Sequence, residues 1–162
     1  MNGARIVRSV TLRDIAADLF APYGELLESP GNAARLDHAA EIANHRPAAR
    51  ANLAVVRAEP APVRLEITEL ERHPWSSQAF IPIDVEQYLV VVARDDGGGR
   101  PDLATLAAFR VSGRQGISYR AGIWHFGMTT LKRSGIFAML VHEDGSTDDC
   151  HFQAVEPFEV RR

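Results

Sequence analysis

The fold class follows from the stretch VRLEITELERH, residues 63–73, in which apolar and polar side chains alternate. A period of two is typical of a β-strand with one buried face. From Leu53 onward this period dominates, and it predicts further strands at residues 78–83, 87–93, 107–111, 116–119, 123–126, 136–142 and 151–155. Turn-forming clusters of Gly, Asp and Ser separate them. Many short strands at this spacing indicate a β-sandwich or a small barrel.

Polar side chains continue the alternation at the end of this stretch. If Ile67 faces inward, Glu69, Glu71 and His73 face inward as well. Two carboxylates and an imidazole are costly to bury unless they contact a ligand, a metal or one another. A β-bulge near Leu70 would exchange the two faces of the strand. The alternative is that Glu69 and Glu71 are ordinary solvated strand residues, and both arrangements stay open.

A single helix is predicted before the strands. Thr11 can cap it, with Asp14 three residues later, and apolar residues recur on one helical face up to Leu19. Pro22 ends the helix. Residues 29–50 are rich in Ala, Asn and Arg with weak periodicity, which indicates a loop with room for one short helix.

The composition fits one globular domain that covers residues 1–162. The formal net charge is −3, and 17 arginines and one lysine are scattered along the chain. A nucleic-acid or anionic-membrane partner needs clustered positive charge, so we expect neither. A single cysteine, Cys150, excludes an internal disulfide and a Cys-rich zinc site. Because the sequence has no stretch typical of a transmembrane helix or a signal peptide, we expect a cytoplasmic protein.

A second polar feature lies at residues 119–125, YRAGIWH. The sequence reads as a turn that enters a strand, which places Trp124 and His125 on opposite faces. A lone histidine on a strand is more often a core or surface residue than a ligand, so His125 becomes a candidate only together with Glu71 and His73. Phosphate loops, serine elbows and CxxC pairs are absent from the sequence, which leaves nucleotide transfer and thiol chemistry without support.

The two polar features together resemble the paired motifs of the cupins. There a first motif supplies His-x-His followed by Glu, and a second supplies Pro-x-Gly-x-x-His. Glu71-x-His73 with Gln78 five residues later has the first spacing, and RAGIWH at residues 120–125 is similar to the second. The resemblance implies a mainly β fold: a cupin double-stranded β-helix, a jelly-roll-like barrel of two antiparallel sheets with a short N-terminal helix. Its cavity would be lined by Glu71, His73, Gln78 and His125.

More narrowly, the chain resembles the ureidoglycolate lyase family, also called ureidoglycolate hydrolase, a cupin-fold group of allantoin breakdown. The resemblance spans residues 11–28 and 53–158 with gaps. It is carried by FAPYGE at residues 20–25, LERHP at 70–74, QAFIP at 78–82, VVVA at 90–93, PDL at 101–103, GISY at 116–119, WH at 124–125 and DC at 149–150.

The resemblance implies a carbon–nitrogen lyase of purine catabolism that converts ureidoglycolate to glyoxylate and urea. A base removes the hydroxyl proton, the C–N bond breaks, and an acid protonates the leaving nitrogen. We expect His125 as the base and His73 or Glu71 as the acid. Gln78 would hydrogen-bond the ureido group or the carboxylate. For the carboxylate itself we expect Arg120, and we include Tyr119 and Trp124 among the substrate-binding residues.

No cofactor is expected to be required. The resemblance implies that a divalent ion such as nickel stimulates the enzyme, and its ligands would be Glu71, His73, Gln78 and His125. Glutamate and glutamine make this set harder and weaker than a His-rich cupin site. The resemblance also implies a small-molecule substrate and a homodimer.

Departures from the family pattern leave alternatives open. Phe126 and Gly127 stand where the family usually has His and Pro, and Asp84 and Val85 where it usually has Lys and Gly. Residues 29–50 also lack a clear counterpart of the family's R-x-H-D-like string. One alternative is a non-catalytic cupin that binds a small carboxylate or ureide. The other is an enzyme that acts on a different 2-hydroxy or 2-oxo acid.

Overall fold

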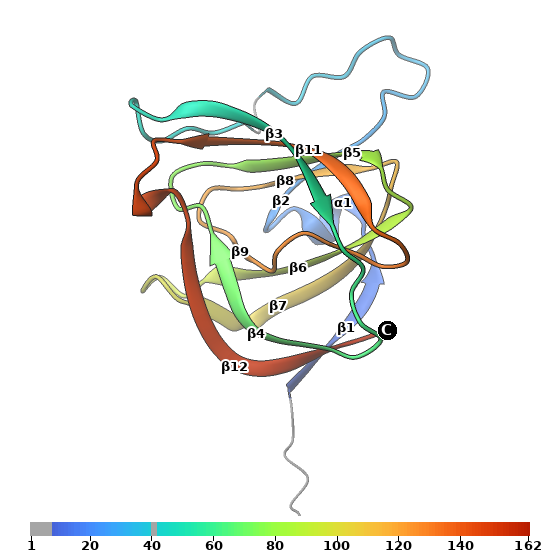
Figure 1. Cartoon of the computed structure of the whole chain (residues 1–162), viewed down its shortest axis with the longest axis vertical. Helices are drawn as coiled ribbons and strands as arrows, with labels where there is room; N and C mark the ends of the chain where they lie inside the picture. The colour runs from blue at the N-terminus through green and yellow to red at the C-terminus, as the bar shows by residue number, and fades with distance from the viewer. Residues whose placement is uncertain (1–7, 40–41) are drawn as a thin grey trace, which may run out of the picture.

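Two β-sheets make up the computed structural model, which describes residues 8–39 and 42–162 (Figure 1). The strands are β1 Arg8–Asp14, β2 Gly24–Leu27, β3 Arg50–Ala58, β4 Leu65–Arg72, β5 Gln78–Asp84, β6 Gln87–Asp95, β7 Pro101–Ser112, β8 Gly116–Tyr119, β9 Trp124–His125, β10 Thr129–Thr130, β11 Gly135–Glu143 and β12 His151–Arg161. A single α-helical turn, α1 Ala17–Phe20, and a 3₁₀ turn, Thr147–Asp149, are the helical elements named among the described residues.

The first sheet closes on itself. Its order is β10-β6-β7-β1-β12-β4-β9, and a further β6–β9 pairing joins its ends into a ring of β6, β7, β1, β12, β4 and β9. The second sheet has the order β2-β8-β5-β11-β3 and lies across the ring (Figure 1). The predicted β-barrel is confirmed. The prediction of two purely antiparallel sheets is wrong at β1, which runs parallel to both β7 and β12.

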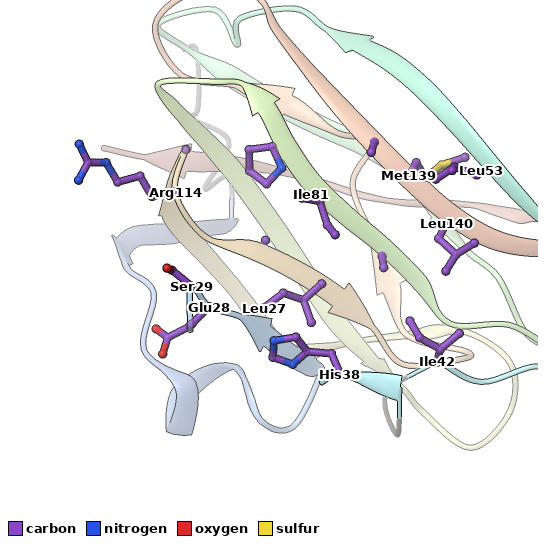
Figure 2. Close-up of a pocket in the computed structure, with 15 residues that line it drawn as sticks. Leu27, Glu28, Ser29, His38, Ile42, Leu53, Ile81, Arg114, Met139 and Leu140 are labelled. Atoms are coloured by element: carbon purple, nitrogen blue, oxygen red, sulfur yellow. The ribbon is translucent and has the colours of Figure 1, made fainter. Parts of the chain in front are cut away.

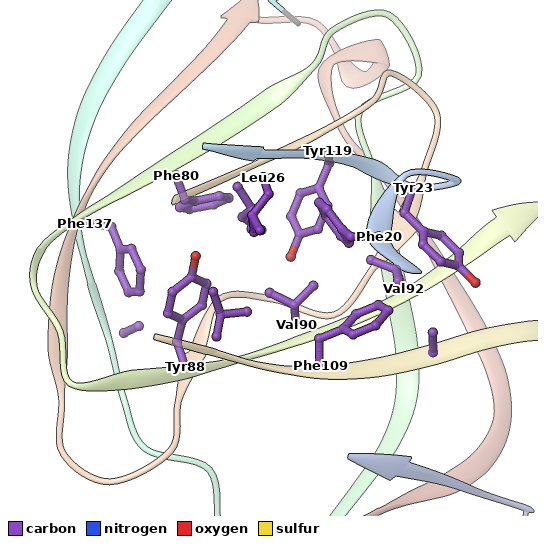
Figure 3. Close-up of a cluster of buried hydrophobic side chains, with 14 residues drawn as sticks. Phe20, Tyr23, Leu26, Phe80, Tyr88, Val90, Val92, Phe109, Tyr119 and Phe137 are labelled. Carbon is purple, nitrogen blue, oxygen red and sulfur yellow. The ribbon is translucent and has the colours of Figure 1, made fainter. Parts of the chain in front are cut away.

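Buried side chains form two clusters, a ring core inside the closed sheet and an inter-sheet core between the ring and the second sheet. Strand β6 contributes to both clusters, because Leu89 and Val91 face the ring core while Val90 and Val92 face the inter-sheet core. A strand buried on both faces reads as a continuous apolar run, as residues 89–93 do. The inter-sheet core holds aromatic rings that pack edge to face, among them Phe20, Tyr88, Phe80, Phe109 and Phe137 (Figure 3).

The N-terminal helix is shorter than its sequence pattern predicts. Residues 8–14 form β1, whose Leu12 packs in the ring core, so the predicted cap at Thr11 is wrong. Helical propensity is a weak prior, and pairing with two neighbouring strands outweighs it here. The short N-terminal helix itself is confirmed as α1, which ends with the buried Phe20.

The strands predicted after Leu53 are confirmed, most of them with longer ends; β12 continues to Arg161. The described part of residues 29–49 is mainly turn and coil, as predicted for a loop. Residues 40–41, which belong to that loop, lie outside the described residues.

A register shift in the pairing of β4 with β12 decides where the polar end of β4 points. Ile67 pairs with Phe158 and Glu69 pairs with Ala154, so residues 155–157 stand opposite Thr68 alone. Ile67 and Leu70 both pack in the ring core, although they are three residues apart. The two faces therefore exchange between them, as a bulge requires. Of the two arrangements that the sequence leaves open, Glu69 takes the solvated one, since it is exposed, and Glu71 lies on the strand face opposite to Leu70.

Candidate functional site

Strand β9 brings the two sequence motifs together. His125 pairs with Glu71 of β4 on one side and with Val92 of β6 on the other. Directly paired residues of neighbouring strands share a face, so His125 and Glu71 lie on the Val92 side, toward the inter-sheet core. His73 follows directly after β4. The site therefore lies at one end of the inter-sheet core, outside the ring.

Three side chains meet there. Glu71 Oε1 lies 3.4 Å from His125 Nε2, and the rings of His73 and His125 stack with centroids 5.7 Å apart. One ligand atom from each of Glu71, His73 and His125 lies within 4.8 Å of those of the other two. Both imidazoles are buried, whereas about a quarter of the Glu71 side chain stays exposed. The carboxylate is therefore the accessible edge of the cluster.

Backbone carbonyls set the orientation of both imidazoles. His73 Nδ1 lies 2.8 Å from the Asp149 carbonyl oxygen, and His125 Nδ1 lies 3.0 Å from that of Ile123. Because a carbonyl only accepts, each Nδ1 carries a proton and donates it. In the neutral imidazole the lone pair then sits on Nε2. Both Nε2 atoms are buried and have no hydrogen-bond partner among the described residues.

The cluster also sets the charge of its members. Burial raises the pKa of Glu71, but the close contact with His125 and the positive charge that His125 and His73 carry when protonated outweigh it, and the pKa of Glu71 lies below its usual value. Burial and the neighbouring His125 lower the pKa of His73, against the contact with the Asp149 carbonyl and the charge of Glu71. Near neutral pH, Glu71 is therefore ionised and His73 is neutral.

Tyr119 and Gln78 extend the site along the second sheet. The ring of Tyr119 stacks on His125 at a centroid distance of 4.2 Å and an interplanar angle of 12°. Gln78 pairs with Tyr119 across β5 and β8 and points toward the inter-sheet space, as Phe80 does two residues later. Its amide nitrogen donates to Met139 Sδ, while its amide oxygen is buried without a partner among the described residues.

Two predicted substrate-binding residues lie apart from this cluster. Trp124 pairs with Ala93 and packs in the ring core, where its Nε1 donates to Asp95. In this position Trp124 does not lie beside the substrate, as the sequence predicts it would. The cause is the alternation of β9, which turns Trp124 away from His125. Arg120 is exposed and its guanidinium donates to the Ala21 carbonyl, so its role toward the carboxylate stays a prediction.

The residues of the cluster fit a divalent metal ion. Two imidazoles and one carboxylate are common ligands of such ions, and each histidine already donates its other ring nitrogen to a carbonyl, as metal-bound histidines do. Glu71, His73 and His125 supply these ligand atoms. The fourth predicted ligand, Gln78, lies opposite Tyr119 on the neighbouring strand, and its role as a ligand stays a prediction.

A more voluminous hollow lies away from the cluster. It measures about 450 Å³ and lies on the outer face of the second sheet, where Leu53, Ile81 and Leu140 face His38 and Ile42 (Figure 2). Its lining is mostly apolar and includes none of the three clustered residues. A smaller hollow of about 360 Å³ borders Glu71 and is lined also by Glu69, Phe126, Gly127 and Phe152. The chemistry therefore belongs to the cluster, and the outer hollow needs another explanation.

Sequence comparisons show the family to which the chain belongs. A family model described as ureidoglycolate lyase matches residues 7–161. Proteins named ureidoglycolate lyase are similar over most of their length: the one from Pseudomonas syringae pv. tomato is 35% identical over 153 residues, 89% of this chain and 88% of the relative. The protein from Stutzerimonas stutzeri is 33% identical over 89% of this chain and 88% of its own, and that from Pseudomonas putida 31% over 89% and 90%.

Among solved structures, RmlC from Streptococcus suis in complex with dTDP-D-xylose is similar to the chain with a TM-score of 0.41 and 14% sequence identity. The similarity covers 62% of this chain and 46% of RmlC.

Proposed function

Because the chain belongs to the ureidoglycolate lyase family, we propose that it is a carbon–nitrogen lyase that cleaves ureidoglycolate to glyoxylate and urea. The observation that supports this activity is the cluster of Glu71, His73 and His125, where two imidazole lone pairs and a carboxylate face one another. Such groups are suited to moving a proton on a small hydroxy acid. In this proposal the enzyme belongs to allantoin breakdown in the cytoplasm.

His125 is the proposed base. Its Nε2 takes the proton of the substrate hydroxyl, the oxygen forms the carbonyl of glyoxylate, and the electron pair of the C–N bond moves to the leaving nitrogen. The imidazolium then holds the proton that this nitrogen needs to become urea. Glu71 Oε1, 3.4 Å from Nε2, stabilises the imidazolium between the two transfers.

The charge states favour this assignment over a separate acid. Sequence patterns suggest His73 or Glu71 as the acid, but a neutral His73 donates its only ring proton to the Asp149 carbonyl, and Glu71 is ionised. We therefore propose that His73 and Gln78 orient the substrate. The unpartnered Nε2 of His73 would accept a hydrogen bond, and the amide oxygen of Gln78 would accept one from the ureido group.

A divalent ion is proposed as a stimulant rather than a requirement. Glu71, His73 and His125 would hold it. When bound, the ion would supply a Lewis acid and a positive charge close to the substrate carboxylate. Chelation tests the proposal: treated protein keeps its melting temperature and a measurable share of its activity. Complete loss of activity, restored only by added metal, would move the three residues from proton transfer to ligation.

The resemblance implies a homodimer, and we propose the outer face of the second sheet as its interface. Cross-strand rows of small and apolar residues run over this face, one of them Ile81–Ala138–Val55 and the next Ala79–Leu140–Leu53. Leu53 is 73% and Ile81 55% exposed. Isologous dimers bury such a patch against its own copy.

Ligand binding tests the proposed substrate class without relying on turnover. A ligand that binds only the native state raises the melting temperature. Glyoxylate should raise that of the wild type and leave that of His73→Ala unchanged, whereas a bulkier 2-oxo acid should have no effect. A larger shift with the bulkier acid would instead support an enzyme or binding protein for another substrate.

A further inference from the structure

Arg46 is a nearly buried arginine whose partners lie across the chain in the turn between β11 and β12. Its guanidinium contacts the carboxylates of Asp144, at 3.0 Å, and Asp149, and its side chain is 16% exposed. The Asp149 carboxylate in turn accepts from the backbone N–H groups of Asp144 and Gly145, at 2.9 and 2.7 Å. Arg46 and Asp149 therefore hold the turn of residues 144–149 in one shape. A partly buried pair with these extra hydrogen bonds is more constrained than an exposed ion pair.

The same turn provides the carbonyl that orients His73. It is the backbone oxygen of Asp149 that accepts from His73 Nδ1 at 2.8 Å. The next residue, Cys150, places its thiol 4.0 Å from Glu71 Oε2. A shift of the turn would therefore move both the acceptor of His73 and the surroundings of Glu71.

The segment that carries Arg46 is also tied to the chain just after His73. The backbone N–H of His45 donates to the Trp75 carbonyl at 2.8 Å, and Ala43 exchanges hydrogen bonds with Ser77. Arg46 thus connects the backbone that follows His73 to the turn that accepts its ring proton.

From these contacts we propose that Arg46 is a positioning residue. Through Asp149 it fixes the carbonyl that keeps His73 in its Nδ1–H tautomer, with the Nε2 lone pair directed into the site. The proposal rests on the proposed function for its effect on rate, but its structural part is independent of any activity. Partners that orient a functional histidine commonly change activity 10–100-fold when they are removed.

The direct test is ¹⁵N NMR of histidine-labelled Arg46→Met at a pH where the imidazoles are neutral. In the wild type, the two ring nitrogens of His73 should differ in shift as one tautomer requires. In Arg46→Met the two shifts should move toward each other, while those of His125, held by Ile123 in another loop, should not. Unchanged shifts of His73 would overturn the proposal. Equal changes at both histidines would mean a general loosening and overturn it too.

Matched variants separate this role from charge and folding. Arg133→Met removes an exposed arginine–aspartate pair with Asp84 and should change neither histidine nor rate. Arg46→Lys should restore part of the wild-type His73 signal. If Arg46→Met does not fold, Asp144→Asn removes one partner of the guanidinium and should shift His73 in the same direction; no shift there would count against the proposal.

Kinetics then connect the network to the reaction. Arg46→Met should lower kcat about tenfold or more and leave KM within a few-fold. If the wild type releases no urea, the proposed function fails, yet the NMR result still decides the role of Arg46. An active Arg46→Met with wild-type kcat would overturn the positioning role alone.

Discussion

At the residue scale, the decisive feature is that His73 and His125 direct buried Nε2 atoms, which have no hydrogen-bond partner among the described residues, toward one carboxylate. Each imidazole is oriented by a different backbone carbonyl, so the loss of one ring leaves the other in place. His125→Ala should therefore lower kcat about 10²-fold or more, since a positioned proton-transfer group contributes about 10²–10⁴-fold. His151→Ala, at a half-exposed position beside Asp148, is the control and should keep wild-type kcat. Steady-state urea release measures both, and full activity in His125→Ala would place the chemistry elsewhere.

The buried His73 also predicts how stability depends on pH. Burial lowers its pKa in the folded protein, while the unfolded chain takes up the proton near the ordinary value of about 6.5. The unfolded state then binds more protons below this pH, so the free energy of unfolding falls as the pH drops from 7 to 5. Urea unfolding at several pH values should show a shallower fall in His73→Gln than in the wild type. Identical slopes would mean that His73 does not titrate as its burial requires.

At the scale of elements, the backbone of β2 lies close to that of β8, the strand whose Tyr119 ring stacks on His125. A Cβ added at Gly24 would lie 2.0 Å from the Ser118 carbonyl oxygen, in the paired backbone. Gly24→Ala should therefore destabilise the protein by about 1–3 kcal/mol, as overpacking does. Gly127→Ala is the control, because no heavy atom lies within 4 Å of its added Cβ. Thermal unfolding compares the two, and equal melting temperatures would contradict the close β2–β8 approach.

The sequence predicts an element well when the residues of that element alone determine its structure, and poorly when distant strands determine it. The strand alternation and turn residues are local, and they predict a β-sandwich or a small barrel. The resemblance to the cupins adds the barrel and the meeting of Glu71-x-His73 with His125. Long-range pairing is not local. It makes residues 8–14 a strand where the capping pattern predicts a helix, and the shift opposite Thr68 turns Glu69 outward.

Side chains that act through the backbone also leave little trace in the sequence. Asp149 contributes its carbonyl oxygen, which every residue type has, so no motif marks it as a partner of His73. Arg46 lies 103 residues from Asp149 in a segment with no regular period. The carboxylates at Asp144 and Asp149 are the one visible hint, since a buried arginine needs such partners.

At the scale of the whole molecule, the apolar outer face of the second sheet predicts assembly. A charge at its centre would have to be buried against a second copy. Ile81→Glu should therefore shift the protein toward monomer with little change in melting temperature of the monomer, because the position is half exposed within one chain. Val63→Glu places the same charge at an exposed apolar position away from this face and should leave the assembly unchanged. Light scattering at micromolar concentration gives the masses, and a monomeric wild type would contradict the interface.

None of the helices among the described residues is long and apolar enough to cross a bilayer.

Cleavage of ureidoglycolate at this site is measured by counting the urea released from the substrate against a no-enzyme control at the same pH. The control is needed because the substrate is a carbinolamine, which can break down unaided. The wild type should release urea well above this background, and His125→Ala should fall back toward it. A wild type that binds glyoxylate but releases urea only at the background rate would contradict the lyase and support a binding protein.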